Sequence, residues 1–389
     1  MKVRYLLLHA YGMGGTIRTV INQANALARL GHDVEIVSVV RRRDTPRFPL
    51  HPGVRLSTLV DQRENVAADS AGRKLWRRVR GKAVPLGETA AGYFTERVER
   101  AAIAFAAGLS GGILVTTRPA LNLISARYGS RKVIRVGQEH LNLDTHAEPV
   151  RKAIARHYGK LDLLTVLTRT DRAAYRRLLP GTTVVRVPNA VHTANQRRSR
   201  QQHPVVVAAG RLVKQKGFDL LIPAFQQVAA RHPEWRLRIF GHGPRRRELL
   251  DLIGDSDAIT LEGRTQRLDD ELADASVYAL SSRHEGLPMV MIEAMTHALP
   301  IVAFDCPTGP GEVLTDGEDG LLVPPQDVSA LAAGLERLVT DRSLRLRMGA
   351  AAARTAEDYT PEAVTPMWED LFSELLHGER ITDSFWSDR

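Results

Sequence analysis

The sequence has one cysteine, Cys306, among its 389 residues, and it is poor in aromatic residues, which make up 5%. A single cysteine cannot form an intramolecular disulfide or supply a thiolate metal site. No apolar run approaches the roughly 20 residues that a membrane-spanning helix needs. The apolar run Tyr5–Leu8 ends at His9, which is too short for a signal peptide. These absences exclude a secreted disulfide scaffold and a transmembrane protein, and they favour a cytoplasmic location.

Charge is distributed unevenly along the chain. Residues 1–200 hold 35 Lys and Arg against 14 Asp and Glu, a net charge of +21, whereas residues 201–389 hold 19 against 30, a net charge of −11. We therefore expect the first half to face an anionic partner. This partner is either an acceptor that carries phosphate or carboxylate groups or an anionic membrane surface. A bias toward arginine with no partner behind it is the alternative.

The densest positive charge lies at Arg73–Lys82. As a helix, this stretch would resemble a basic amphipathic surface for phospholipid head groups, which predicts peripheral contact with the inner face of the membrane. A solvated helix face explains the same pattern. We expect no nucleic-acid partner, because the chain has no recognisable binding motif and no basic patch interleaved with aromatic residues.

Short apolar runs alternate with helical patterns in both halves of the chain. Hydrophobic residues make up 43% of the sequence. A chain of 389 residues is too long to fold around a single hydrophobic core, so we expect two domains. Near-continuous apolar strands that alternate with helices predict parallel sheets covered on both faces. The expected strands are Val3–His9, Val34–Val40, Ile113–Thr117, Val133–Val136, Leu163–Leu167, Val184–Val187, Val205–Ala209, Leu237–Phe240, Ile259–Leu261, Val277–Leu280, Ile301–Phe304 and Leu321–Val323.

The fold class that follows is α/β, with two doubly wound, Rossmann-like domains that face a cleft. We expect a first domain over residues 1–195, a second over 196–360, and a C-terminal segment, 361–389, whose helix packs back across the cleft. Residues 41–90 match no clear pattern, since they contain several prolines and no regular periodicity.

Two loops at predicted strand ends are candidates for binding an anion. The turn Gly12–Gly15 joins the first strand to a helix, so its backbone could approach a phosphate, although a tight turn without a ligand explains it equally well. The second loop, Gly210–Gly217, carries Arg211 and Lys216 beyond the carboxyl end of a strand, where open α/β sheets bind ligands. Two cations there suit a diphosphate leaving group.

The most informative segment is residues 281–295, where a strand, a glycine turn and a helix follow one another. We expect Pro288 at the first helical position, where its missing N–H does no harm. The free N–H groups of that first turn can bind phosphate oxygens. Glu285 and Glu293 are eight residues apart, which suits two separate hydroxyl-bearing groups of an extended ligand better than one metal ion.

Four motifs occur in a fixed order along the chain: the Gly14-Gly15 turn, the segment Gly210–Gly217, the turn Gly241–Pro244 and the Glu285–Glu293 pair. Together they resemble the family 4 glycosyltransferases, over the whole length and most closely over residues 205–325. The resemblance implies the two-domain GT-B fold. The segment Asp305–Val313 also resembles family members that elongate bacterial surface glycans.

The resemblance assigns roles to individual residues. Arg211 and Lys216 match the pair that neutralises the donor diphosphate, and Glu293 matches the carboxylate that binds the donor ribose. Glu285 matches the carboxylate near the donor sugar, and His140 matches a histidine beside donor sugar and acceptor; we assign both catalytic roles, together with Arg211 and Lys216. The other expected donor contacts are Gly14, Gly15, Gly241, Arg264, Gly286, Leu287, Met289 and Val290.

The expected activity is a retaining, metal-independent transfer of a hexosyl group. The donor would be a nucleotide-sugar, with a UDP-sugar favoured, and it is a substrate, so no cofactor is expected. The acceptor would be a hydroxyl of a cell-envelope glycan, polymer or lipid, and an anionic one suits the charge of the first half. The string Asp255–Asp257 is interpreted as a turn rather than a metal site. A nucleotide-sugar epimerase of the same fold and a non-catalytic binding protein are the alternatives.

Overall fold

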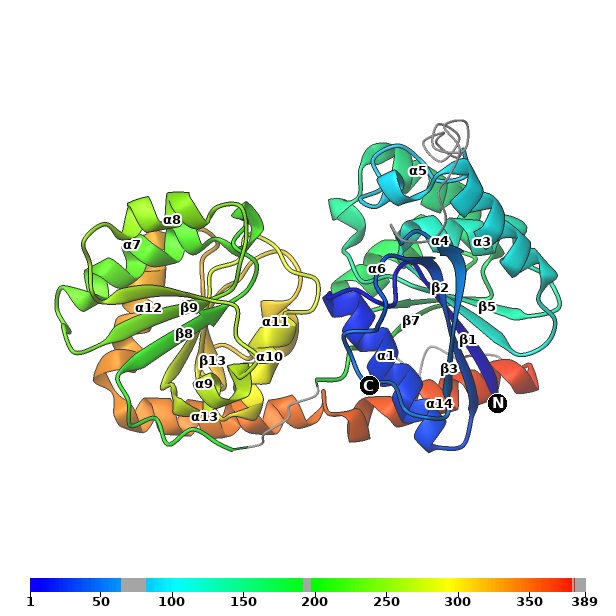
Figure 1. The fold of residues 1–389 in the computed structure, drawn as a ribbon. Coiled ribbons are helices and arrows are strands. Elements are labelled where there is room, and N and C mark those ends of the chain that lie inside the picture. Colours follow the sequence, from blue (N-terminus) through cyan, green and yellow to red (C-terminus); the bar gives the residue numbers. More distant parts are fainter. Residues whose placement is uncertain (64–81, 192–196, 380, 382–389) are drawn as a thin grey trace. The chain divides into compact units, whose positions relative to one another are not determined.

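The computed structural model describes residues 1–63, 82–191, 197–379 and 381 (Figure 1). The chain forms two compact units. Unit 1 contains Met1–Ala190 together with Val364–Arg389, and unit 2 contains Val191–Ala363. The basic stretch that begins at Arg73 lies, apart from its last residue Lys82, outside the described residues. In the part of the chain that is described, no helix is long and apolar enough to cross a membrane.

Unit 1 is built on a seven-stranded sheet in the order β3-β2-β1-β4-β5-β6-β7, in which every neighbouring pair is parallel. Its strands are β1 (Lys2–Leu7), β2 (Asp33–Arg41), β3 (Val54–Asp61), β4 (Ile113–Thr117), β5 (Ile134–Gln138), β6 (Leu163–Val166) and β7 (Val184–Arg186). Its helices are α1 (Gly15–Arg29), α3 (Glu96–Gly108), α4 (Arg118–Tyr128), α5 (Glu148–His157), α6 (Arg169–Leu178) and α14 (Pro361–His377).

The sheet of unit 1 is covered on both faces. Alternate side chains of β1 point to opposite faces, so Tyr5 packs with α1 and α14, whereas Leu6 packs with α3 and α4. This double burial explains why β1 reads as a continuous apolar run. The sequence did not predict β3, because this edge strand is only partly buried and carries polar residues such as Arg55 and Ser57.

Unit 2 has a six-stranded parallel sheet in the order β10-β9-β8-β11-β12-β13. Its strands are β8 (Val205–Ala209), β9 (Arg236–Phe240), β10 (Ile259–Gly263), β11 (Val277–Leu280), β12 (Ile301–Phe304) and β13 (Gly320–Val323). Its helices are α7 (Phe218–Ala229), α8 (Arg246–Ile253), α9 (Leu268–Asp274), α10 (Met289–Thr296), α11 (Pro310–Val313), α12 (Val328–Thr340) and α13 (Arg342–Glu357). The expected fold class, two parallel α/β sheets, is confirmed.

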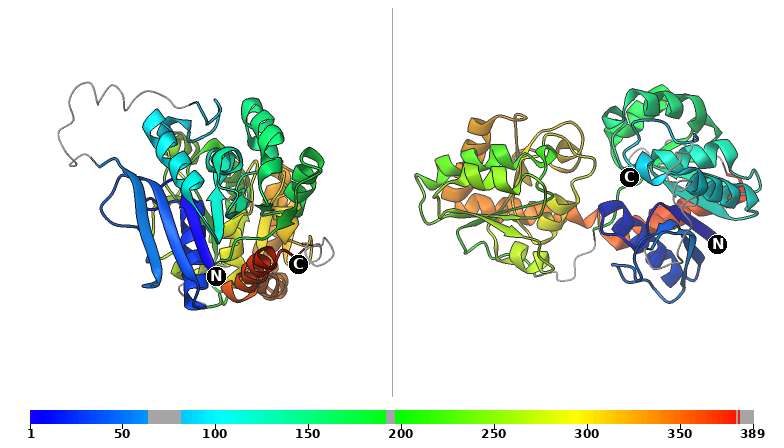
Figure 2. Two further views of the ribbon diagram at one scale, coloured as in Figure 1. Left: turned by 90° about the vertical axis from the view of Figure 1, so that its right-hand side faces the viewer. Right: turned by 45° about the horizontal axis from the view of Figure 1, so that its top comes forward.

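The C-terminal helix α14 packs on the N-terminal sheet. Its residues Met367, Trp368, Leu371 and Phe372 are buried in the same cluster as β1 and α1. In Figures 1 and 2 this helix, drawn in red, lies beside the N-terminal strand and helix, drawn in blue. A hydrogen bond of 3.1 Å between His32 and Glu369 adds a polar contact at the edge of this interface. Residues from both ends of the chain therefore complete the core of unit 1.

Replacement of Phe372 by alanine should destabilise unit 1. Phe372 is fully buried, so the change removes apolar contacts and leaves a cavity, at a cost of about 3–5 kcal/mol in the free energy of unfolding. Urea unfolding followed by circular dichroism measures this cost. Leu376→Ala is the matched control, because Leu376 lies on the same helix and is 40% exposed. Equal losses in both variants would contradict the packing of α14.

Candidate functional site

Three loops meet at one edge of the unit 2 sheet. They follow β8, β11 and β12, which are neighbours in the sheet, so their carboxyl ends lie together. Here the ammonium group of Lys216 lies 2.6 Å from Oε1 of Glu285. The Ser282 hydroxyl donates a hydrogen bond of 2.5 Å to the same carboxylate oxygen. The structure thus brings two of the expected catalytic residues, from loops 69 residues apart, into direct contact.

Glycine at position 217 makes this contact achievable. The residue has a φ of +65°, and a Cβ there would lie 1.9 Å from the carbonyl oxygen of Ser281. The Ser281 hydroxyl in turn donates to the Lys216 carbonyl at 3.0 Å. The Arg283 amide donates to the Gln215 carbonyl at 2.8 Å. The two loops are therefore joined by hydrogen bonds to backbone carbonyls, which fix the positions of Lys216 and Glu285.

Asp219, next to this crevice, uses two further arginines. Arg283 donates two hydrogen bonds to its carboxylate, at 2.9 and 2.8 Å, and Arg245 donates a third at 3.1 Å. Burial raises the pKa of Asp219, but the two guanidinium groups outweigh burial and hold the pKa below its ordinary value. The positive charges of Arg283 and Arg245 are thus largely compensated.

Arg211 and Lys216 differ in how their charges are balanced. Lys216 is compensated by Glu285, whereas Arg211 is exposed and makes no ion pair with any described residue.

The buried thiol of Cys306 also lies in this region. Burial, and then the charge of Glu285, raises its pKa to about 12. This cysteine stays protonated at neutral pH, so it is not a nucleophile.

The helix α10 begins at this crevice, one residue later than predicted. Pro288 was expected at the first helical position, but it is the N-cap residue, and its carbonyl accepts the first bonds of the helix, from Met291 and Ile292. The amide N–H groups of Gly286, Leu287 and Val290 have no hydrogen-bond partner within the described part of the chain. Unsatisfied amides at a helix N-terminus form a favourable environment for an anion.

The remaining expected donor contacts of unit 2 lie in nearby elements. Glu293 is in α10, 8% exposed, and Met289 is half-buried at the start of that helix. Arg264 is exposed after β10, and no described residue pairs with it. Gly241 follows β9, where a Cβ would lie 1.8 Å from the Gly210 carbonyl oxygen. Glycine at 241 is thus required by the packing of two loops, whatever ligand binds.

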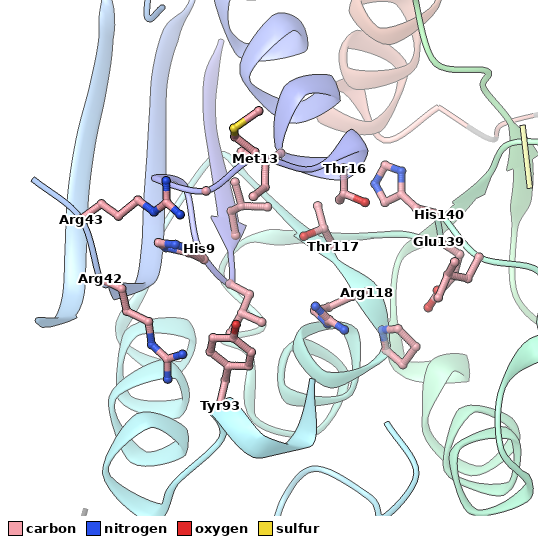
Figure 3. Close-up of a pocket in the computed structure, with 16 residues that line it drawn as sticks. His9, Met13, Thr16, Arg42, Arg43, Tyr93, Thr117, Arg118, Glu139 and His140 are labelled. Atoms are coloured by element: carbon pink, nitrogen blue, oxygen red, sulfur yellow. The ribbon is translucent and has the colours of Figure 1, made fainter. Parts of the chain in front are cut away.

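Unit 1 contains a pocket of about 600 Å³ at the carboxyl ends of its central strands (Figure 3). His140, the expected catalytic histidine of this unit, lines it together with Met13 and Thr16 from the turn before and into α1. Gly14 and Gly15 lie between Met13 and Thr16, and neither has a positive φ. A Cβ at position 15 would meet no atom within 4 Å, so the protein itself does not require glycine there.

His140 is held neutral by its surroundings. Both ring nitrogens are buried, and neither has a hydrogen-bond partner in the described residues. Burial lowers the pKa of His140 to about 4, Glu139 opposes this effect, and Arg118 adds to it. A neutral imidazole at pH 7 can donate one hydrogen bond and accept another.

A buried network that the sequence did not predict supports this strand end. Oε1 of Glu139 accepts hydrogen bonds from the Tyr158 hydroxyl at 2.5 Å and from the Asn122 amide at 2.8 Å. The ring of His146 lies 3.7 Å from the other carboxylate oxygen. Burial, and then the charge of Glu139, raises the pKa of Tyr158 well above its usual value. This network fixes the backbone from which His140 projects.

Three arginines of the pocket were also missed. Arg42 and Arg43 follow β2, and Arg118 follows β4 with a positive φ of 72°. Positive φ is unfavourable for arginine, and such strain clusters at functional sites. The run Arg41-Arg42-Arg43 directly after a predicted strand was the available signal, because the carboxyl end of a parallel strand faces the ligand edge of the sheet.

Comparison with known proteins decides the family. Residues 203–341 match the family described as glycosyl transferases group 1. The amylovoran biosynthesis glycosyltransferase AmsD of Erwinia amylovora is 32% identical over 247 residues, which cover 60% of this chain and 69% of that protein. The chain belongs to the group 1 glycosyltransferases. The resemblance to family 4 and the GT-B fold, which the motifs implied, is thereby confirmed.

Two further similarities place this glycosyltransferase among its relatives. The exopolysaccharide phosphotransferase SCO2592 of Streptomyces coelicolor is 33% identical over 390 residues, which are 97% of this chain. The chain spans only 41% of the length of that relative. A crystal structure of Staphylococcus aureus TarM, 16% identical, superposes with a TM-score of 0.75 and covers 96% of this chain and 100% of TarM. The last similarity concerns the fold alone.

The His140 imidazole of this glycosyltransferase should stay neutral until the pH falls to about 4. Its ordinary pKa is 6.5, so between pH 6.5 and 4 the unfolded chain binds a proton that the folded chain does not. This group therefore lowers stability as the pH falls through that window. Imidazole NMR signals recorded against pH measure the pKa, and His140→Gln assigns the signal. Titration of His140 near pH 6.5 would contradict the burial of its ring.

Proposed function

We propose that this protein is a retaining glycosyltransferase that moves a hexosyl group from a nucleotide-sugar, with a UDP-sugar favoured, to an acceptor hydroxyl without a metal ion. The Lys216–Glu285 pair beside the start of α10 carries the proposal, because it combines a cation, a buried carboxylate and free backbone amides in one crevice. The TarM crystal structure contains UDP, which supports uracil as the base of the donor nucleotide.

In the proposed donor complex the diphosphate lies against Arg211, Lys216 and the first turn of α10. The cations and the amides of Gly286, Leu287 and Val290 would stabilise the negative charge that develops as the nucleotide departs. Glu293 would bind the ribose hydroxyls, and the Arg264 loop would receive the base. Gly14 and Gly15 stay proposed donor contacts on the family resemblance alone.

The Glu285 carboxylate contacts the Lys216 ammonium and the Ser282 hydroxyl. We expect the diphosphate to take over part of the Lys216 charge, which frees Glu285 to accept a hydrogen bond from a donor-sugar hydroxyl. A neutral His140 would position the sugar and the acceptor by hydrogen bonds. It would add no positive charge beside a ring that itself gains positive character.

The transfer step is proposed to occur on one face of the sugar. The bond between the anomeric carbon and the phosphate oxygen breaks, and the bond to the acceptor oxygen forms on the same side, so the configuration is retained. The departing phosphate oxygen takes the acceptor proton, and the nucleoside diphosphate leaves. The acceptor is proposed to be a glycan, polymer or lipid of the cell envelope that carries negative charge, which the net charge of +21 over residues 1–200 supports.

Glu285→Gln and His140→Ala should each slow UDP release from the active UDP-sugar by about 100-fold or more, because both groups contact the reacting sugar. A coupled assay of UDP release over a panel of UDP-sugars measures the slow transfer of the sugar to water, so it needs no added acceptor. Glu318→Gln is the control, since Glu318 is an exposed carboxylate of the same unit. Losses below about tenfold in both site variants would remove these role assignments.

A further inference from the structure

One side of the unit 1 pocket carries arginines whose charges are not compensated. Arg42 and Arg43 come from the loop that follows β2, and in Figure 3 they lie with His9 on the side of the pocket opposite His140 and Glu139. Burial lowers the pKa of His9, the hydrogen bond with the Val40 carbonyl opposes this effect, and Arg42 and Arg43 add to it, so the neutral imidazole is favoured. The two sides of the pocket thus differ in charge.

Asp44, in this loop, and Asp61, at the end of β3, contact Arg63 rather than Arg42 or Arg43. Arg63 contacts Asp44 at 2.5 Å and Asp61 at 2.6 Å. Arg41 donates hydrogen bonds to the carbonyl oxygens of Arg43 and Asp44, at 3.1 and 2.7 Å, which fixes the course of the loop. Neither acid forms an ion pair with the two pocket arginines within the described residues.

The guanidinium of Arg42 is held in a defined plane. It lies 4.1 Å from the centre of the Tyr93 ring, and its Nε donates to the Gln62 side chain at 2.8 Å. Its two terminal NH₂ groups make no hydrogen bond within the described residues. Stacking on an aromatic ring leaves the donor edge of an arginine free and pre-oriented for a planar or tetrahedral oxyanion.

The third arginine that lines the pocket, Arg118, is compensated by a carboxylate. Arg118 is paired with the buried carboxylate of Glu88 at 2.8 Å and donates to Thr89 at 2.9 Å. Arg43, in contrast, is exposed and has no hydrogen bond or ion pair from its side chain within the described residues. The uncompensated charge of the pocket is thus concentrated on two consecutive side chains.

We infer that Arg42 and Arg43 form a subsite for an oxyanion, a phosphate or a carboxylate, on the acceptor. The anion would bind at the arginine side of the pocket, and the accepting hydroxyl would extend toward His140. Arginine side chains bind both kinds of oxyanion through paired N–H donors, so either source satisfies the geometry. This inference rests on the proposed transferase function, and it narrows the acceptor to molecules with an anionic group close to the reacting hydroxyl.

The test compares anionic probes with neutral ones of the same shape. Glycerol 3-phosphate and glucuronate represent the phosphate and carboxylate sources, and glycerol and glucose are their neutral counterparts. Ligand-observed NMR titrations with wild-type protein, Arg42→Gln and Arg43→Gln measure each affinity at 50 and 300 mM salt. Arg47→Gln is the matched control, because Arg47 is an exposed arginine of the same loop that does not line the pocket.

We expect at least one anionic probe to bind more tightly than its neutral counterpart and to weaken as salt is added. Each pocket variant should weaken that binding by about tenfold or more, the effect of losing a charge-assisted hydrogen bond, and the Arg47 variant should change it by less than twofold. The probe with the stronger preference identifies phosphate or carboxylate as the source. Equal binding of charged and neutral probes, no binding of any probe, or equal losses in the Arg42 and Arg47 variants would overturn the subsite.

UDP affinity, measured on the same samples by calorimetry, separates this inference from the proposed function. UDP should bind the wild type and the three arginine variants equally, because none of the replaced arginines is among the residues proposed to hold the nucleotide. Loss of anionic-probe binding with intact UDP binding supports the subsite. Absence of UDP binding in the wild type would remove the proposed function, whatever the probes show.

Discussion

The ion pair between Lys216 and Glu285 is the interaction on which the site of unit 2 depends. Its side chains are only 19% and 6% exposed, so both charges have lost much of their hydration. A buried pair of this kind seldom adds net stability, since apolar residues of similar volume serve as well or better. We propose that the pair is preorganised for a ligand, so that Lys216 would exchange Glu285 for the donor diphosphate and Glu285 would exchange Lys216 for a donor-sugar hydroxyl.

The loops around this pair are closely packed, and this packing positions the two side chains. Gly217 has a left-handed backbone and lies against Ser281, and Gly241 lies against Gly210, at distances that exclude a side chain. Hydrogen bonds then join the loop after β8 to the loop after β11. Unit 1 uses a different device, in which a buried Glu139 is satisfied by Tyr158 and Asn122, and the adjacent His140 is kept neutral by burial.

Much of this architecture could be predicted from the sequence. Strands buried on both faces, such as β8 and β11, were located to the residue, because their apolar runs are short, continuous and bounded by turns. The edge strand β3 was missed, since partial burial gives a mixed pattern. The helices α12 and α13 were not predicted either; α13 is rich in alanine, which gives little periodic contrast.

The site was predictable only where a local motif marks its residues. Glu285 and Lys216 could be named because their spacing belongs to motifs, and the structure then shows their contact. The partners of Glu139 come from distant segments with ordinary local sequence, so no motif marks them. The arginines at the end of β2 were visible as a charged run, but only their stacking and pairing in the structure distinguish Arg42 from the many other arginines of this half.

Thermal stability in the presence of UDP, GDP, ADP or CDP, measured for the wild type, Lys216→Ala, Glu293→Ala and Lys214→Ala, tests whether the donor binds beside Lys216 and Glu285. A nucleotide at 100 times its dissociation constant should stabilise the protein by about 2.7 kcal/mol. We expect UDP to raise the melting temperature of the wild type and of Lys214→Ala, in which the replaced side chain is exposed on the same turn, and to leave that of the Lys216 and Glu293 variants unchanged. No shift with any nucleotide, or a shift that survives in both site variants, would contradict a donor site at the Lys216–Glu285 crevice.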